Sequence, residues 1–215
     1  MSSDLPVPDP AALDPQTQIW PQDRQIVRCH DSRFGATEFN PGIGSGRFHP
    51  FADRAGRGVP TLYGAGTLDG AFSETLFHGV SVRGPGRIIR RGSLKPMLVS
   101  TLAPDRDLTL VQLHGYGLRR LGISRAELIE TDSDRYGETV LWARALHAWD
   151  ESIDGLVWVS RQHDTSAALV LFGDRVRREQ LRVIEPPLPL YVDPGFDMVE
   201  RAAQAAGISV VAVPE

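Results

Sequence analysis

Three residue types that could together cut a glycosidic bond lie close together, between residues 46 and 74. Arg47 stands in a Gly-rich loop, Tyr63 ends a short apolar strand, and Glu74 falls in the first turns of an expected helix. An arginine can hold a diphosphate through two parallel hydrogen bonds, and an aromatic face can stack on a flat heterocycle. A carboxylate can stabilise positive charge on a sugar carbon. The combination suits cleavage of the glycosidic bond of a dinucleotide.

Two further polar residues lie in strand-like runs. Arg28 is inside the apolar run 25–30, and Ser160 closes the run 155–160. Each of the five residues also has an ordinary structural explanation, such as an ion-paired arginine, a core tyrosine or a turn serine. Glu74 could simply offset the positive N-terminal end of its helix. The site hypothesis therefore requires that these side chains converge on one pocket.

Other kinds of site have weaker support. The glycines of residues 64–70 have the spacing GxGxxxG, and the acid expected about twenty residues beyond a dinucleotide-binding turn is missing. The six histidines form no HxH or HxxxH pair, and Cys29 is the only cysteine, so we expect no metal site. No GxSxG motif marks a serine hydrolase.

The composition limits the partners. The 215 residues carry 23 basic and 27 acidic side chains, a net charge of −4, which gives no general attraction to nucleic acid or membrane. Residues 83–95 hold five basic residues and no acid, which indicates a solvated or partner-binding face. The single cysteine, the absence of a signal-like N-terminus and the lack of an 18-residue apolar run favour a cytoplasmic protein.

The expected elements define one domain, residues 23–215, preceded by a Pro-rich extended arm, residues 1–22, that is disordered or laid over another surface. The irregular loop 31–60 is long enough to be functional, and the prolines at 186, 187 and 189 should break the chain. Strands do not alternate regularly with helices, so we expect an α+β fold with a compact mixed or antiparallel β core flanked by helices. We expect strands over residues 25–30, 61–63, 97–102, 108–113, 155–160, 167–172, 180–184 and 208–213, and helices over 69–78, 116–129, 135–149 and 196–206.

The order of these motifs resembles the RES domain, a family named for its Arg, Glu and Ser. The resemblance covers roughly residues 24–185. The matching segments are residues 27–28 (VR), 46–50 (GRFHP), 61–63 (TLY), 71–74 (AFSE) and 154–161 (DGLVWVSR).

The resemblance implies a function. Characterised RES proteins are toxins of bacterial toxin–antitoxin pairs, with a core similar to ADP-ribosyltransferase toxins. They degrade NAD by hydrolysis or phosphorolysis, and their partner is an Xre-like antitoxin that blocks the active site. By this similarity Arg28, Tyr63, Glu74 and Ser160 form the site, and Arg47 is a further NAD-contacting arginine.

The resemblance implies NAD as substrate, with inorganic phosphate as one candidate co-substrate and no metal. A homodimer or a toxin–antitoxin hetero-oligomer is compatible with it, and no direct contact with nucleic acid or membrane is expected. Cys29 stands where the family often has an aromatic residue, and His49 where it often has an asparagine. The segment 51–58, between the GRFHP motif and the strand 61–63, is longer than is usual in the family. Two alternatives stay open: a mono-ADP-ribosyltransferase acting on a protein, and a RES-like module that only binds.

Overall fold

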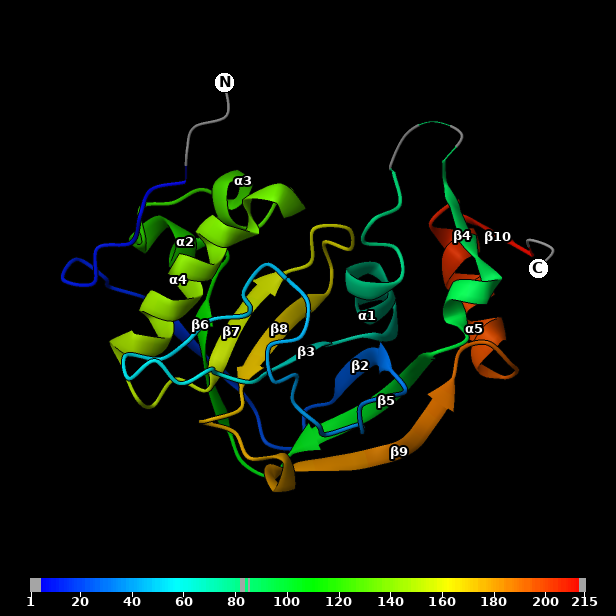
Figure 1. Cartoon of the computed structure of the whole chain (residues 1–215), viewed down its shortest axis with the longest axis horizontal. Helices are drawn as coiled ribbons and strands as arrows, with labels where there is room; N and C mark the ends of the chain where they lie inside the picture. Colours follow the sequence, from blue (N-terminus) through cyan, green and yellow to red (C-terminus); the bar gives the residue numbers. More distant parts are fainter. Residues whose placement is uncertain (1–4, 82–83, 85, 213–215) are drawn as a thin grey trace.

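A curled eight-stranded sheet forms the centre of the protein in the computed structural model, which describes residues 5–81, 84 and 86–212 (Figure 1). Its strand order is β1-β6-β7-β8-β3-β2-β5-β9, and neighbouring strands are antiparallel except for the parallel pair β6 and β7. The strands are β1 (Thr17–Trp20), β2 (Ile26–Asp31), β3 (Thr61–Ala65), β5 (Met97–Pro104), β6 (Leu108–Gln112), β7 (Gly155–Val159), β8 (Ala167–Phe172) and β9 (Leu181–Pro189).

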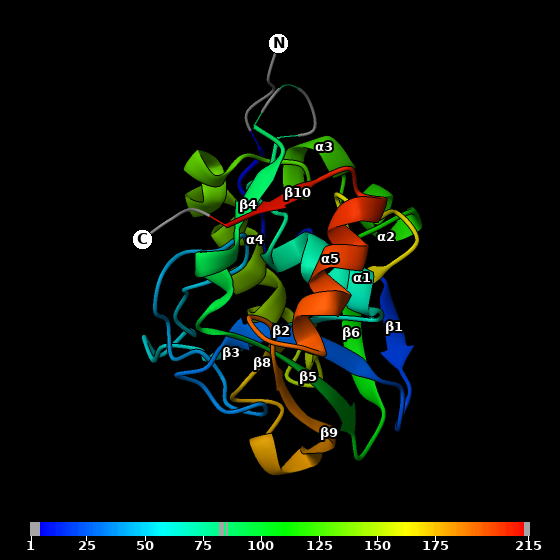
Figure 2. The ribbon, with the colours of Figure 1, turned by 90° about the vertical axis from the view of Figure 1, so that its right-hand side faces the viewer.

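Helices flank this sheet in two groups. The first group, α2, α3 and α4, lies over β6, β7 and β8, and the second, α1 and α5, lies near β2 and β5 (Figure 1). A small parallel pair, β4 and β10, stands beside α5 (Figure 2). The α+β prediction with a mixed, mostly antiparallel core is confirmed. The bounds are α1 (Leu68–Thr75), α2 (Tyr116–Arg120), α3 (Arg125–Leu128), α4 (Tyr136–Trp149), α5 (Gly195–Ala205), β4 (Ile88–Arg90) and β10 (Ser209–Val211), with short 3₁₀ turns at Arg91–Leu94, Ser133–Arg135 and Arg178–Gln180.

Two apolar clusters pack the helices onto the sheet. The first joins Trp142 of α4 to Trp158 of β7 and its neighbours, and the second joins Phe72 of α1 and Val199 of α5 to Val27 of β2. Strands β7 and β8 are buried almost throughout, which explains why their sequences are apolar at successive positions rather than at alternate ones.

Helix α1 is shorter than the sequence predicts. It begins after Thr67, whose side chain accepts a hydrogen bond from the Gly70 amide, and it ends at Thr75. Glu74 is therefore in the last turn of the helix and not near its N-terminus. A carboxylate at that end gains nothing from the helix dipole, so the simple structural explanation for Glu74 does not hold.

Two other expectations were wrong. The helix expected over residues 116–129 is two short helices, because Gly122 turns the chain with a φ of 69° and Ser124 starts α3 with a capping box to Glu127. The prolines at the end of β9 do not break it. This strand pairs only with β5 at an edge of the sheet, and its register against β5 shifts between the pairs Thr101–Glu185 and Val99–Leu188. Pro186 and Pro187 therefore lie in a bulge of an edge strand, where prolines are tolerated.

Residues 5–22 lie against the rest of the domain. Leu5 is buried, the Trp142 indole donates to the Pro6 carbonyl at 2.8 Å, and β1 pairs with β6. Residues 1–4 lie outside the described part, as does Arg83 of the basic run, while Arg91 of that run packs 3.8 Å from the Phe196 ring centroid. Among the described residues, no helix is long and apolar enough to cross a membrane.

Candidate active site

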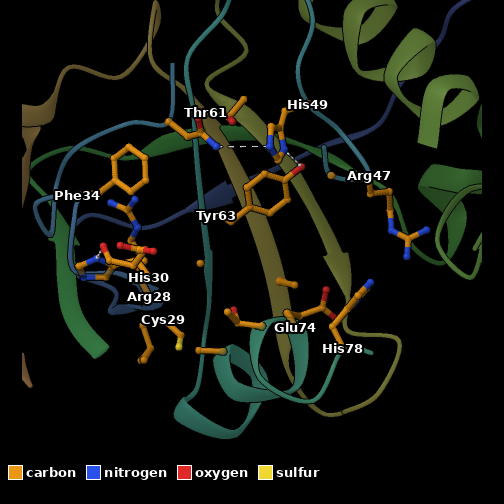
Figure 3. Close-up of a pocket in the computed structure, with 18 of the residues that line it drawn as sticks. Arg28, Cys29, His30, Phe34, Arg47, His49, Thr61, Tyr63, Glu74 and His78 are labelled. Atoms are coloured by element: carbon orange, nitrogen blue, oxygen red, sulfur yellow. Dashed lines mark hydrogen bonds between the residues drawn. The ribbon is translucent and has the colours of Figure 1, made fainter. Parts of the chain in front are cut away.

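A cavity of about 380 Å³ opens between β2, β3 and α1. Four of the five residues predicted from the sequence line it, and they come from four separate segments: Arg28 from β2, Arg47 from the loop before β3, Tyr63 from β3 and Glu74 from α1. Figure 3 shows Tyr63 in the middle, Glu74 below it on α1 and Arg28 on the opposite side from Glu74. The apolar part of the wall includes Trp158. The cavity therefore combines two arginines, the carboxylates of Glu74 and Asp31, and aromatic faces.

The fifth residue, Ser160, does not line the cavity but contacts Glu74. It is fully buried, and its hydroxyl donates to Glu74 Oε1 at 2.6 Å. The same hydroxyl accepts from the amides of Gln162 at 3.3 Å and His163 at 3.2 Å. These two incoming bonds direct the serine proton toward the carboxylate. Ser160 thus positions the Glu74 carboxylate from outside the cavity.

Glu74 is half-buried, and one of its oxygens is fully engaged. Oε1 accepts from Ser160 and, at 3.2 Å, from the backbone amide of Arg161. Within the described part of the chain, Oε2 accepts no hydrogen bond. The carboxylate is therefore fixed through one oxygen and can offer the other to a ligand in the cavity.

The GRFHP motif folds into a tight turn beside Tyr63. Gly46 and His49 exchange backbone hydrogen bonds of 2.9 and 3.3 Å. A Cβ on Gly46 would come within 2.6 Å of the His49 ring, so the turn requires glycine at this position. The turn places Phe48 in the core, edge-on to Trp158 with ring centroids 5.1 Å apart. The motif is thus a structural unit that carries Arg47 and His49.

Tyr63 is held by that turn. Its hydroxyl accepts from the Phe48 amide at 3.0 Å and lies 3.2 Å from His49 Nδ1. Its ring meets His49 and Trp158 edge-on, with centroids 5.3 and 6.2 Å apart. Burial raises the pKa of the Tyr63 phenol well above its ordinary value, so the hydroxyl stays protonated at neutral pH. Burial likewise lowers the pKa of His49, which keeps that ring neutral.

Arg47 is anchored at its tip. Nη1 donates to the carbonyls of Leu128 at 3.3 Å and Thr131 at 3.0 Å, and the guanidinium lies 5.2 Å from the Tyr136 ring centroid. The residue is 5% exposed, and burial lowers its pKa. Carbonyls bring no net charge, so the positive charge of Arg47 remains available to attract an anion, with the negative charge of Glu74 partly offsetting it.

Arg28 has a comparable arrangement on the other side. Nη1 donates to the carbonyls of Gly35, Ala36 and Glu38 at 3.3, 2.8 and 2.7 Å. Burial lowers the pKa of Arg28 to about 10, with the Glu38 charge acting in the opposite direction. The guanidinium is still charged at neutral pH. Arg28 therefore holds the loop after β2 in addition to presenting charge to the cavity.

Other cavity residues were not identified as site residues from the sequence. His78 and Tyr136 both line it, and His78 Nε2 lies 2.8 Å from the Tyr136 hydroxyl. His78 follows Glu74 by four residues and His49 belongs to the GRFHP motif, so both carried a usable signal. Tyr136 comes from the start of a distant helix, and no local pattern points to it. Phe34, also in the wall, lies in the irregular loop.

Neither a cysteine nucleophile nor a metal cluster is found among the described residues. Burial raises the pKa of the Cys29 thiol to about 12, so it is not a thiolate nucleophile at neutral pH. The described residues contain no cluster of three or more His, Cys, Asp or Glu side chains that could hold a metal ion.

The fold and the cavity define an α+β protein with two carboxylates, two buried arginines and two tyrosines around a ligand-sized space. The RES domain model matches residues 25–193, and the chain therefore belongs to the RES-domain family. A search of curated proteins gives no match. A solved structure described as the M. tuberculosis MbcT–MbcA toxin–antitoxin complex contains a chain of similar fold, with a TM-score of 0.55, 16% identity, and coverage of 80% of this chain and 88% of that one.

Proposed function

We propose that this protein cleaves the bond between nicotinamide and ribose in NAD⁺ and transfers the ADP-ribosyl group to phosphate or water. The observation that carries the proposal is the fixed carboxylate of Glu74, with Oε1 held by Ser160 and Oε2 facing no partner among the described residues. Arg28, Arg47 and Tyr63 line the same cavity. A volume of about 380 Å³ is within the usual range for small-molecule sites.

The reaction does not need a general acid. When the bond between the ribose C1′ and the nicotinamide nitrogen breaks, its electron pair returns to the ring, and the cationic nicotinamide leaves as a neutral molecule. Positive charge then develops on C1′ and the ring oxygen of the ribose. Glu74 stabilises that charge and accepts from a ribose hydroxyl. An oxygen of water or phosphate forms the new bond to C1′ and releases any proton to solvent.

The arginines supply orientation rather than bond cleavage. A diphosphate carries two negative charges, which the guanidinium groups of Arg28 and Arg47 attract from a buried setting where solvent screens little. Anchoring the diphosphate holds the reacting ribose against Glu74. Ser160 acts through Glu74, and Tyr63 forms the aromatic wall next to the nicotinamide half.

We further propose that the protein is a cytoplasmic toxin neutralised by a protein antitoxin of the Xre-like kind. Support comes from its membership of the RES family and from the fold shared with a chain of a complex described as toxin–antitoxin. In this proposal residues 23–215 are the catalytic domain, and the mouth of the cavity is the place an antitoxin would cover.

Nicotinamide release tests the function. Purified protein is mixed with NAD⁺, with and without inorganic phosphate, and free nicotinamide is followed over time. Release that requires phosphate identifies a phosphorylase, and equal release identifies a hydrolase. Release only when a target protein is added identifies a mono-ADP-ribosyltransferase. The absence of release in all three conditions refutes the enzymatic proposal and leaves a binding module.

A further inference from the structure

Phe34 is an aromatic ring placed outside the core. It is half-buried and lines the cavity, yet it belongs to none of the three apolar clusters formed by the described residues. Phe39, five residues further along the same loop, packs against one of those clusters in the usual way. A phenyl ring held at a cavity wall leaves apolar surface in contact with water, which is unfavourable unless a ligand covers it.

The loop that carries Phe34 is tied down. Arg28 Nη1 donates to the carbonyls of Gly35, Ala36 and Glu38, the residues that follow Phe34 at one to four positions. Three hydrogen bonds from one charged group fix the backbone next to the ring. The ring is therefore presented to the cavity by a preorganised loop, which lowers the entropy cost of binding a flat ligand.

The ring lies at the end of the cavity away from the proposed reaction centre. Figure 3 shows Phe34 beside Arg28 and His30, while Glu74 and His78 lie on the other side of Tyr63. If the nicotinamide ribose meets Glu74 and the diphosphate meets Arg28, the remaining part of NAD⁺ is the adenosine. The adenosine then extends toward Phe34.

We propose that Phe34 forms an adenine subsite in which its ring stacks on the purine of NAD⁺. This inference rests on the proposed function, because it takes the orientation of NAD⁺ from the role of Glu74. Stacking recognises the face of a base and not its hydrogen-bonding edge, so the subsite accepts any planar purine. The subsite contributes binding and leaves the bond-breaking step unchanged. The Arg33 guanidinium lies over the ring, 5.9 Å from its centroid.

The test compares two substrates and two variants. NAD⁺ carries the adenosine, and nicotinamide mononucleotide carries the same reacting bond without it. Phe34→Leu removes the aromatic face and keeps an apolar side chain, whereas Phe34→Trp keeps a stacking surface. We expect Phe34→Leu to raise KM for NAD⁺ about tenfold, the size of a base–aromatic stack, with kcat within about twofold. We expect no change in its kcat/KM for the mononucleotide, and near-normal KM values for Phe34→Trp.

Several results would overturn the inference. If Phe34→Leu has an unchanged KM for NAD⁺, or loses kcat/KM equally with both substrates, Phe34 does not bind the adenine. If the wild-type protein releases no nicotinamide, the proposed function fails, and calorimetric titration of NAD⁺ into the wild type and Phe34→Leu then tests the subsite by binding alone. Equal affinities, or no binding to either protein, refute the subsite. Matching thermal unfolding curves confirm that the Phe34→Leu protein is folded.

Discussion

Replacing Ser160 with alanine removes the hydroxyl that holds Glu74. The wild-type hydroxyl donates to Glu74 Oε1 at 2.6 Å, and the only other donor to that oxygen among the described residues is the Arg161 amide at 3.2 Å. A hydrogen bond to a charged group contributes about 1.5–3 kcal/mol. If that amount is lost from the transition state, kcat falls by roughly 10- to 150-fold, since about 1.4 kcal/mol corresponds to tenfold.

A matched control separates catalysis from stability. Ser166 is also almost fully buried and lies on the same β7–β8 connection, where its carbonyl accepts from the Ser160 amide at 2.9 Å. Its hydroxyl accepts from Thr67 at 2.8 Å rather than touching Glu74. In urea, Ser160→Ala should lose about 1.5–3 kcal/mol of stability, because its hydroxyl bonds a carboxylate, and Ser166→Ala about 0.5–1.5 kcal/mol, because its partners are neutral. Only the Ser160 variant should lose kcat in the nicotinamide assay.

The reasoning fails under either of two outcomes. A Ser160→Ala enzyme with kcat within about twofold of wild type shows that the hydroxyl does not set the position of the carboxylate. An equal loss of kcat in Ser166→Ala shows that the effect comes from the shape of the connection, and not from the contact with Glu74.

Three further predictions follow from the same contacts. Arg28→Lys should weaken NAD⁺ binding and make the loop after β2 more mobile, because an ammonium group cannot form the same hydrogen bonds to the three loop carbonyls. Calorimetry should show at least roughly a tenfold loss of affinity together with faster tryptic cleavage at Arg33, and unchanged values for both would contradict this role. Tyr63→Phe should lower the free energy of unfolding by about 1–3 kcal/mol because it leaves the buried Phe48 amide without its acceptor, and an unaltered urea transition would contradict it. Acid should destabilise the fold, because burial lowers the pKa of several histidines in the native state while the unfolded value stays near 6.5. Below that pH the unfolded chain binds more protons, so the free energy of unfolding should fall by up to about 1.4 kcal/mol per pH unit for each such histidine. Urea titrations at pH 7 and pH 5.5 check this, and equal or greater stability at pH 5.5 would contradict it. The histidines are His30, His49, His78 and His114.

Local sequence patterns predicted most of the elements because the relevant interactions are short in range. The apolar runs of β7 and β8 and the periodic pattern of α4 needed no tertiary information. The break between α2 and α3 depends on Gly122 in a left-handed conformation, and a glycine alone does not reveal its φ. The continuation of β9 through its prolines depends on its place at the edge of the sheet, which is a property of the whole topology.

The candidate site was predictable for a different reason. The order of the motifs placed Arg28, Tyr63 and Glu74 together before any contact was known, and these residues do line one cavity. The way they are held was not predictable. That Ser160 stands behind Glu74 and not in the cavity, and that Tyr136 joins the wall from α4, both result from long-range packing.

Glu74→Gln provides the most direct test of the central claim. The change keeps the shape of the side chain and removes only the negative charge, so NAD⁺ should still bind, with a dissociation constant within about threefold of wild type. The rate of nicotinamide release should fall at least about 100-fold, or roughly 2.7 kcal/mol of transition-state stabilisation. If the variant releases nicotinamide within about tenfold of the wild-type rate, the carboxylate does not stabilise the ribosyl cation, and the account of this site is wrong.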